Sequence, residues 1–205
     1  MTESSEERAQ AGVERRAFLR RGGLVAGGAA LGTAMAASSA GAQVSAQAVD
    51  FVYIPVGPTR TYDSRNPGAG GPLGLGGVRT LFTGLQTVDP PPLAITINLT
   101  VTATVGAGWL AVFPGNISFP GTSSINWFGP NQDLANNAFV EIPLDGDAND
   151  GTIKVAAGGI AGSRAQFIID FIGASVGIDF SAVAASDARA QVRSTLSQAP
   201  AWTDS

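Results

Sequence analysis

Residues Ala94 to Val105 read AITINLTVTATV, and this stretch decides the fold class. Apolar and polar side chains alternate along it: Ile95, Ile97, Leu99, Val101, Ala103 and Val105 against Thr96, Asn98, Thr100, Thr102 and Thr104. A period of two over this length is typical of an antiparallel strand with one buried and one solvent-facing side. A helix is disfavoured, because so many β-branched residues would lose side-chain freedom in it.

Shorter strand candidates lie on both sides of this stretch, separated by segments rich in Gly, Pro, Asn and Asp. They are Phe51–Ile54, Thr59–Arg65, Val78–Leu85, Trp109–Phe113, Ser124–Phe128, Ala138–Ile142, Thr152–Ala156 and Ala165–Ile172. Many short strands without a helical pattern predict an all-β, antiparallel β-sandwich of jelly-roll or Ig-like type, with about eight to nine strands. We expect residues 106–108, Gly-Ala-Gly, to join the long strand and Trp109–Phe113 as a hairpin.

The two ends of the chain differ in composition from the predicted sandwich, residues 51–176. Arg15 and Arg16 precede a Gly/Ala-rich stretch, which predicts a twin-arginine signal peptide at 1–42, cleaved after Ala42. We therefore expect the translocase of that pathway as a partner, no permanent membrane anchor, and a secreted, extracellular or cell-wall-associated protein. Residues 43–50 are interpreted as a linker. Residues 177–205 are interpreted as a short flexible or helical tail, loosely held, with a faint helical stripe at Val183, Ala188, Val192 and Leu196.

The composition excludes several kinds of chemistry. The chain has no histidine and no cysteine, so Ser-His-Asp, Cys-His and His-ligated metal sites are ruled out. Its formal net charge is −4 at pH 7, and no basic run occurs outside the signal, so we expect no nucleic-acid partner.

The order of several short motifs resembles a β-sandwich module of secreted actinobacterial proteins. The motifs are PTRTYDSR at 58–65, NLTVT at 98–102, GWLAVFP at 108–114, SSIN at 123–126, DGTIKV at 150–155 and FIIDFIG at 167–173. The resemblance covers roughly Phe51 to Ser175. It implies an extracellular accessory or surface module, found alone or appended to secreted enzymes, and it brings no catalytic residues with it.

Asp63 and Arg65 form the first candidate site. They flank Ser64 at the end of a predicted strand, as a ligand-binding pair or as a structural turn in which Asp63 accepts backbone N–H bonds and Arg65 pairs with a carboxylate. Asp170 lies in an apolar strand and needs a partner, for which we expect Arg60 or Arg65.

An acidic loop forms the second candidate site. Residues 145–151 bring together Asp145, Asp147, Asn149 and Asp150. Calcium favours such oxygen donors, but the spacing departs from the EF-hand and Asn-Asp-Gly is also a common hairpin turn, so a calcium site and a structural turn both stay open. No other cofactor is expected.

Aromatic residues form the third candidate site. The set is Trp109, Trp127, Phe113, Phe119 and Phe128. They form either a platform that stacks on sugar rings or part of the core, and Trp109, beside a predicted turn, is the one we expect to be most exposed.

These observations predict a non-catalytic module that binds a cell-wall or extracellular polysaccharide, or a surface protein, at the cell envelope. One alternative is a self-associating surface or matrix protein that uses its edge strands. Another is a hydrolase that uses carboxylates alone, with Asp133 and Glu141 as the acid and base.

Overall fold

The strand predicted first, β4 (Ala94–Val105), lies inside a sheet in the computed structural model, with a neighbour on each side. The structure describes residues 50–178, 185–198 and 201–204, all within one compact unit, Val49–Ser205. The predicted signal peptide, with Arg15, Arg16 and the cleavage site after Ala42, lies outside the described residues, as does all of the predicted linker except Asp50.

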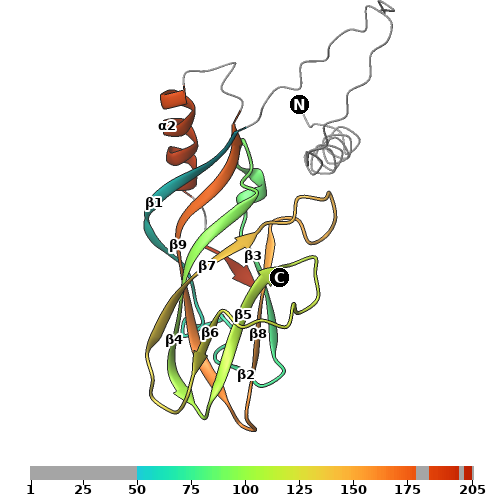
Figure 1. Cartoon of the computed structure of the whole chain (residues 1–205), viewed down its shortest axis with the longest axis vertical. Helices are drawn as coiled ribbons and strands as arrows, with labels where there is room; N and C mark the ends of the chain where they lie inside the picture. Colours follow the sequence, from blue (N-terminus) through green and yellow to red (C-terminus); the bar gives the residue numbers. More distant parts are fainter. Residues whose placement is uncertain (1–49, 179–184, 199–200, 205) are drawn as a thin grey trace, which may run out of the picture. The chain divides into compact units, whose positions relative to one another are not determined.

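Two antiparallel sheets form the sandwich, which confirms the predicted fold class (Figure 1). Sheet A has the order β1 (Asp50–Asp63), β9 (Arg164–Ile178), β4 and β7 (Leu134–Glu141), with the short β2 (Leu73–Gly74) also paired to β9. Sheet B has the order β10 (Thr203–Asp204), β3 (Val78–Phe82), β8 (Thr152–Gly159), β5 (Gly108–Pro114) and β6 (Ile125–Trp127). One 3-10 turn, η1 (Leu85–Thr87), follows β3.

The core lies between the sheets. Ile95, Ile97, Leu99 and Val101 of β4 are fully buried, whereas the Thr and Asn residues between them are half-buried. The same cluster contains Phe167, Ile169 and Phe171 of β9 and, from sheet B, Leu81, Leu110, Ile153 and Val155. Apolar area removed from water contributes about 25 cal/mol per Å², so this cluster is the main stabilising element of the fold.

The predicted hairpin between β4 and β5 does not form. β4 pairs with β7 and β9 in sheet A, whereas β5 pairs with β6 and β8 in sheet B. The short Gly-Ala-Gly connection instead carries the chain from one sheet to the other. The bulge at Ala103 and the left-handed backbone of Gly106 (φ 64°) bend the chain there, and each strand then buries its apolar face against the opposing sheet.

A β-bulge near the end of β4 changes the predicted alternation. The pairing with β9 shifts between Thr102 and Val105, and Ala103 has a left-handed backbone (φ 47°). Thr104 is therefore fully buried and Val105 is 36% exposed, the reverse of what the period of two predicts.

The acidic loop also connects the two sheets. It runs from β7 in sheet A to β8 in sheet B. The prediction of a hairpin turn at Asn149–Gly151 is therefore wrong, because the two strands that it connects do not pair with each other. The chain still turns there through local hydrogen bonds, since the amide of Thr152 donates to the carbonyl of Asn149 (3.0 Å).

The described part of the tail packs against the sandwich and is not loosely held. Helix α2 (Ala185–Leu196) lies beside β1 and β9 (Figure 1), and its Val192 and Leu196 are buried in the core cluster. Trp202 is 4% exposed, and its amide donates to the carbonyl of Thr61 on β1 (2.8 Å). Val183, from the predicted stripe, lies outside the described residues. Within the described residues no helix is long and apolar enough to cross a membrane.

We expect Trp202→Ala to lower the free energy of unfolding by about 3 to 5 kcal/mol, because it leaves a large cavity in the core. Urea unfolding followed by far-UV circular dichroism measures this, with Phe128→Ala, at an 82% exposed position, as the matched control. A loss below about 1 kcal/mol would show that the end of the chain is not part of the folded core.

Candidate functional site

Asp63 and Arg65 form a closed structural turn. The Asp63 carboxylate accepts hydrogen bonds from the amide of Arg65 (3.1 Å) and from its guanidinium at Nε (2.8 Å) and Nη2 (2.6 Å). The side chain of Asp63 is only 7% exposed. The Arg65 guanidinium lowers the pKa of this carboxyl below its usual value. This geometry is the structural alternative predicted for the pair, and it leaves little of the carboxylate open to a ligand.

Asp170 is paired with Arg60, one of its two predicted partners. The Nε of Arg60 lies 3.0 Å from Oδ1 of Asp170, and the two residues are also cross-strand neighbours on β1 and β9. Arg60 reaches Asp63 as well, with Nη1 3.8 Å from Oδ2. The carboxylates of Asp63 and Asp170 are therefore each paired with an arginine of the same chain.

Arg79 on β3 organises the neighbouring corner of the sandwich. Its Nη1 donates to Tyr62 Oη (2.9 Å) and to the carbonyls of Ala69 and Gly71 (3.0 Å each), and its Nη2 donates to the carbonyl of Gly70 (2.9 Å). Tyr62 Oη in turn donates to the carbonyl of Ala69 (2.6 Å). Burial raises the pKa of Tyr62 to about 12, so this hydroxyl stays protonated at neutral pH.

A pocket of about 430 Å³ lies at this corner, between residues 60–69 and residues 201–204. The two carboxylates that line it are both engaged: Asp63 with Arg65, and Asp204 with Arg79, whose Nε lies 3.8 Å from Oδ2. Both carboxylates of the pocket are therefore paired with arginines of the chain, which suits a structural role.

The predicted aromatic platform does not exist as one surface, because Trp109 and Trp127 lie on opposite faces of sheet B. Trp127 pairs with Gly108 and is 1% exposed within the core. Trp109 pairs with Asn126 and Gly158 and lies on the outer face. A Cβ on Gly108 would collide with the Trp127 ring, and one on Gly158 with the Trp109 ring, so each indole is seated on a glycine.

Phe113 and Phe119 gather with Trp109 on the outer face of sheet B, and Phe113 lies 6.2 Å from Phe119 between ring centroids, whereas Phe128 lies apart. Phe113 is buried at 3% exposure, and Phe119 stacks on Trp109 with ring centroids 5.0 Å apart. Trp109 is accordingly half-buried and not the most exposed aromatic residue. Phe128 is 82% exposed but belongs to the loop after β6. The alternation along β5 could have shown that Trp109 and Leu110 point to opposite faces, but not which strand pairs with β5.

The acidic loop holds itself in shape through its carboxylates. Asp150 accepts from the amide of Gly146 at both oxygens (3.0 and 2.9 Å), and Asp147 accepts from the amide of Asn149 (2.7 Å). Asp145 accepts from the side-chain amide of Asn116 (3.1 Å). Among the residues that the structure describes, no group of three or more Asp and Glu side chains is placed to hold a metal ion.

Asp133 and Glu141 do not meet. Asp133 precedes β7 and Glu141 is its last residue, so they lie at opposite ends of an extended strand, about 25 Å apart along its axis. Glycoside chemistry needs two carboxyl groups within about 10 Å. The acid–base pair considered from the sequence is therefore wrong.

The outer face of sheet A brings together residues that the sequence analysis did not single out. Phe139 on the edge strand β7 is 66% exposed and pairs with Thr96, which pairs with Gly173. Tyr53 is 46% exposed and lies over Gly173, with its hydroxyl 3.4 Å from the carbonyl of Ile172. We call this line of residues the aromatic row: Tyr53, Gly173, Thr96 and Phe139.

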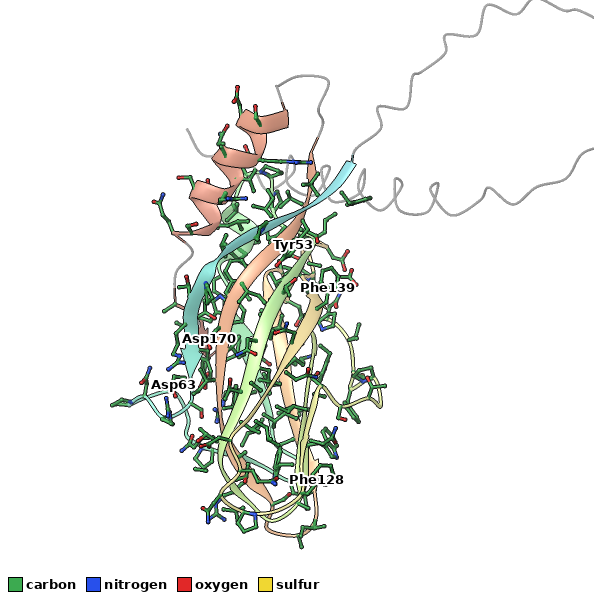
Figure 2. The ribbon with its side chains drawn as sticks, turned by 60° about the vertical axis from the view of Figure 1, so that its left-hand side comes forward. Tyr53, Asp63, Phe128, Phe139 and Asp170 are labelled. Atoms are coloured by element: carbon green, nitrogen blue, oxygen red, sulfur yellow. The ribbon has the colours of Figure 1, made fainter. Side chains whose placement is uncertain are left out.

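A second line of side chains runs beside the aromatic row. Asn98 pairs with Asn137 on one side and Asp170 on the other, and Asp170 pairs with Arg60. We call Arg60, Asp170, Asn98 and Asn137 the polar row. Figure 2 shows Tyr53, Phe139 and Asp170 on sheet A, with Phe128 at the distant end of the sandwich.

The sequence contains a signal for part of this face, namely on which side of their strands its aromatic residues lie. The alternation of Phe51 to Ile54 already places Phe51 and Tyr53 opposite Val52 and Ile54, and that of Ala138 to Val140 places Phe139 opposite its apolar neighbours. The sequence does not show that β1 and β7 lie in the same sheet with only β9 and β4 between them.

A scan against models of known protein families finds no match to this chain, and a search of curated proteins finds no significant match either. The resemblance to the actinobacterial module therefore stays a prediction.

We expect Asp63→Asn to lower the free energy of unfolding at neutral pH by about 2 kcal/mol, since a buried charge-assisted turn is lost. The pKa of Asp63 is lowered in the folded state, so its contribution is present above the usual value of 3.8 and lost as the pH falls through the folded value. Urea unfolding at about pH 7, 4 and 3 should therefore show a smaller acid-dependent loss in the variant than in the parent chain. Equal pH dependence in both proteins would contradict this role.

We expect calcium to leave the melting temperature unchanged, because the loop carboxylates already accept backbone and amide N–H groups. Differential scanning calorimetry with millimolar CaCl₂, against MgCl₂ at the same concentration, measures this. A rise with calcium alone, absent in Asp147→Asn, would instead establish the calcium site predicted from the sequence.

Proposed function

We propose that this protein is a non-catalytic recognition module whose outer sheet A face binds polysaccharide. The observation that carries the proposal is the aromatic row, in which two exposed aromatic side chains, Tyr53 and Phe139, border Gly173 and the small side chain of Thr96. Solvent-exposed aromatic rings on a sheet have a face available for stacking on the apolar faces of sugar rings.

The spacing of the row suits an extended glycan. Gly173, beneath the Tyr53 ring, and Phe139 are two strands apart, which corresponds to about 10 Å across a sheet. That length is close to one disaccharide unit of an extended β-linked chain, so both rings can stack on sugar units of the same face.

The polar row supports the same proposal. Sugar hydroxyls both donate and accept, and side-chain amides such as those of Asn98 and Asn137 do the same. These amides lie beside the aromatic row at neighbouring register positions. The arginine–carboxylate pair at Arg60 and Asp170 cancels its own charge, so the face favours an uncharged polysaccharide over an anionic one.

The place of action follows from the predicted signal. Export through the twin-arginine pathway would put this face in the medium or at the cell wall, where insoluble polysaccharide is available.

We expect the full chain to bind an insoluble neutral polysaccharide, and Tyr53→Ala and Phe139→Ala each to weaken that binding about tenfold, through loss of one stacking face. Depletion from solution by cellulose, chitin and isolated cell wall measures the affinity. Phe128→Ala is the matched control, since it removes an exposed aromatic residue from another part of the surface.

Two outcomes would contradict the proposal. One is the absence of saturable binding to any of these materials. The other is binding that all three variants retain equally. Concentration-dependent assembly in light scattering without any ligand would favour the self-associating alternative, with β7 as an exposed edge strand.

A further inference from the structure

Three loops and the last residue of β4 each expose a large apolar side chain at one end of the sandwich. Leu75 is 55% exposed, Val105 36%, Phe128 82% and Ile160 58%. The strand register places them at the same end: Trp127 and Gly159 both pair with Gly108, and Val105 and Gly74 both pair with Arg164. We call Leu75, Val105, Phe128 and Ile160 the apolar tip, and Figure 2 shows Phe128 at the end of the sandwich away from α2.

The loop that presents Phe128 is held by hydrogen bonds to Thr104, next to a strained backbone at Ala103 in β4. Ala103 and Asn131 are the two non-glycine residues with a left-handed backbone in the described part of the chain. The bulge at Ala103 turns Thr104 inward, where its hydroxyl donates to the carbonyl of Gly129 (2.8 Å) and accepts from the amide of Gln132 (2.8 Å). Strain of this kind persists where the surrounding structure fixes it, and it is concentrated at functional positions.

The backbone N–H groups of Leu75, Phe128 and Ile160 already have acceptors within the chain. The amide of Leu75 donates to the carbonyl of Ser163 (3.1 Å), and that of Ile160 to the carbonyl of Ala107 (3.1 Å). The amide of Phe128 donates to the side chain of Gln132 (2.7 Å). These loops can therefore enter a region poor in water without leaving those donors unpaired.

The charge of the tip is close to zero. Within the loops 75–77, 106–107, 128–133 and 160–163, Asp133 is the single charged residue, and it lies close enough to Arg65 to interact with it electrostatically. Arg164 follows the last loop directly. The tip thus carries neither the basic cluster that anionic lipids attract nor the acidic cluster that they repel.

We propose that the apolar tip docks reversibly into a zwitterionic lipid surface, which carries no net charge. Four side chains offer at most a few hundred Å², less than the about 800 Å² that each partner contributes to a standard protein–protein interface. A second copy of the chain is therefore a poorer occupant than a lipid interface, which accepts side chains from separate loops without a complementary shape. The inference is independent of polysaccharide binding, because it uses none of the residues of sheet A's outer face that we assigned to that function.

The absence of cysteine allows a test at single positions in the full chain. Phe128→Cys and, as the matched control, Phe139→Cys are each labelled with an environment-sensitive fluorophore and titrated with phosphatidylcholine vesicles. We expect a blue shift, and quenching by a quencher attached to the lipid chain, at position 128 and not at position 139. Because residues 1–48 are present in both proteins, any membrane affinity of that segment affects them equally.

Flotation with the same vesicles provides the affinity. Phe128→Ser should weaken partitioning about tenfold or more, since its aromatic ring supplies the largest apolar area of the tip. Adding phosphatidylglycerol to the vesicles should not strengthen binding, and salt should not weaken it. Three results would overturn the proposal: no blue shift at position 128 with vesicles, an equal shift at both positions, or a shift that rises with protein concentration without lipid, which would identify a second copy of the chain as the occupant.

Discussion

The side chain of Arg79 is the polar contact on which the arrangement of the chain around its apolar core most depends. It is only 11% exposed, so its guanidinium must find acceptors inside the protein, and it finds them in three separate parts of the chain. From β3 in sheet B it reaches Tyr62 at the end of β1 in sheet A, the carbonyls of the turn at 69–71, and Asp204 of the C-terminal strand. It also lies over the ring of Phe167, 5.4 Å from its centroid. One cation therefore joins both sheets, the Gly-rich turn and the end of the chain.

The way the two sheets pack decides which aromatic residues are structural and which are open to a partner. Indoles seated on Gly108 and Gly158 fill the inner and outer sides of sheet B, and Phe119 covers Trp109. Phe139 and Phe128, in contrast, are 66% and 82% exposed in the described part of the chain. The tryptophans therefore belong to the packing, and the most exposed aromatic side chains are phenylalanines and a tyrosine. Two different surfaces result: a flat one on sheet A and a set of loop tips at one end.

Charge pairing accounts for the other candidate residues. Asp63, Asp170 and Asp204 each face an arginine of the same chain, and two carboxylates of the acidic loop close that loop by accepting backbone N–H groups. Of the two alternatives for Asp63 the structure has the turn closed by Arg65, and of the two partners expected for Asp170 it has Arg60, because a carboxylate with little exposure to water needs a counter-ion nearby. The Asp133–Glu141 pair failed because residues on one strand that are close in sequence can still lie far apart along an extended chain.

The sequence by itself determined the fold class, the inner face of β4 up to Val101, and the side of β1 and β7 on which Tyr53 and Phe139 lie, because a strand's period of two is a local property of the backbone. The tertiary structure alone decided which strands share a sheet, and with that the separation of β4 from β5 and of Trp109 from Trp127. It also decided that the C-terminal residues complete the core. Strand pairing and packing join residues that are distant in the chain, and many pairings satisfy the same local pattern equally well. The choice among them depends on burying all apolar faces at once, which is a property of the whole domain.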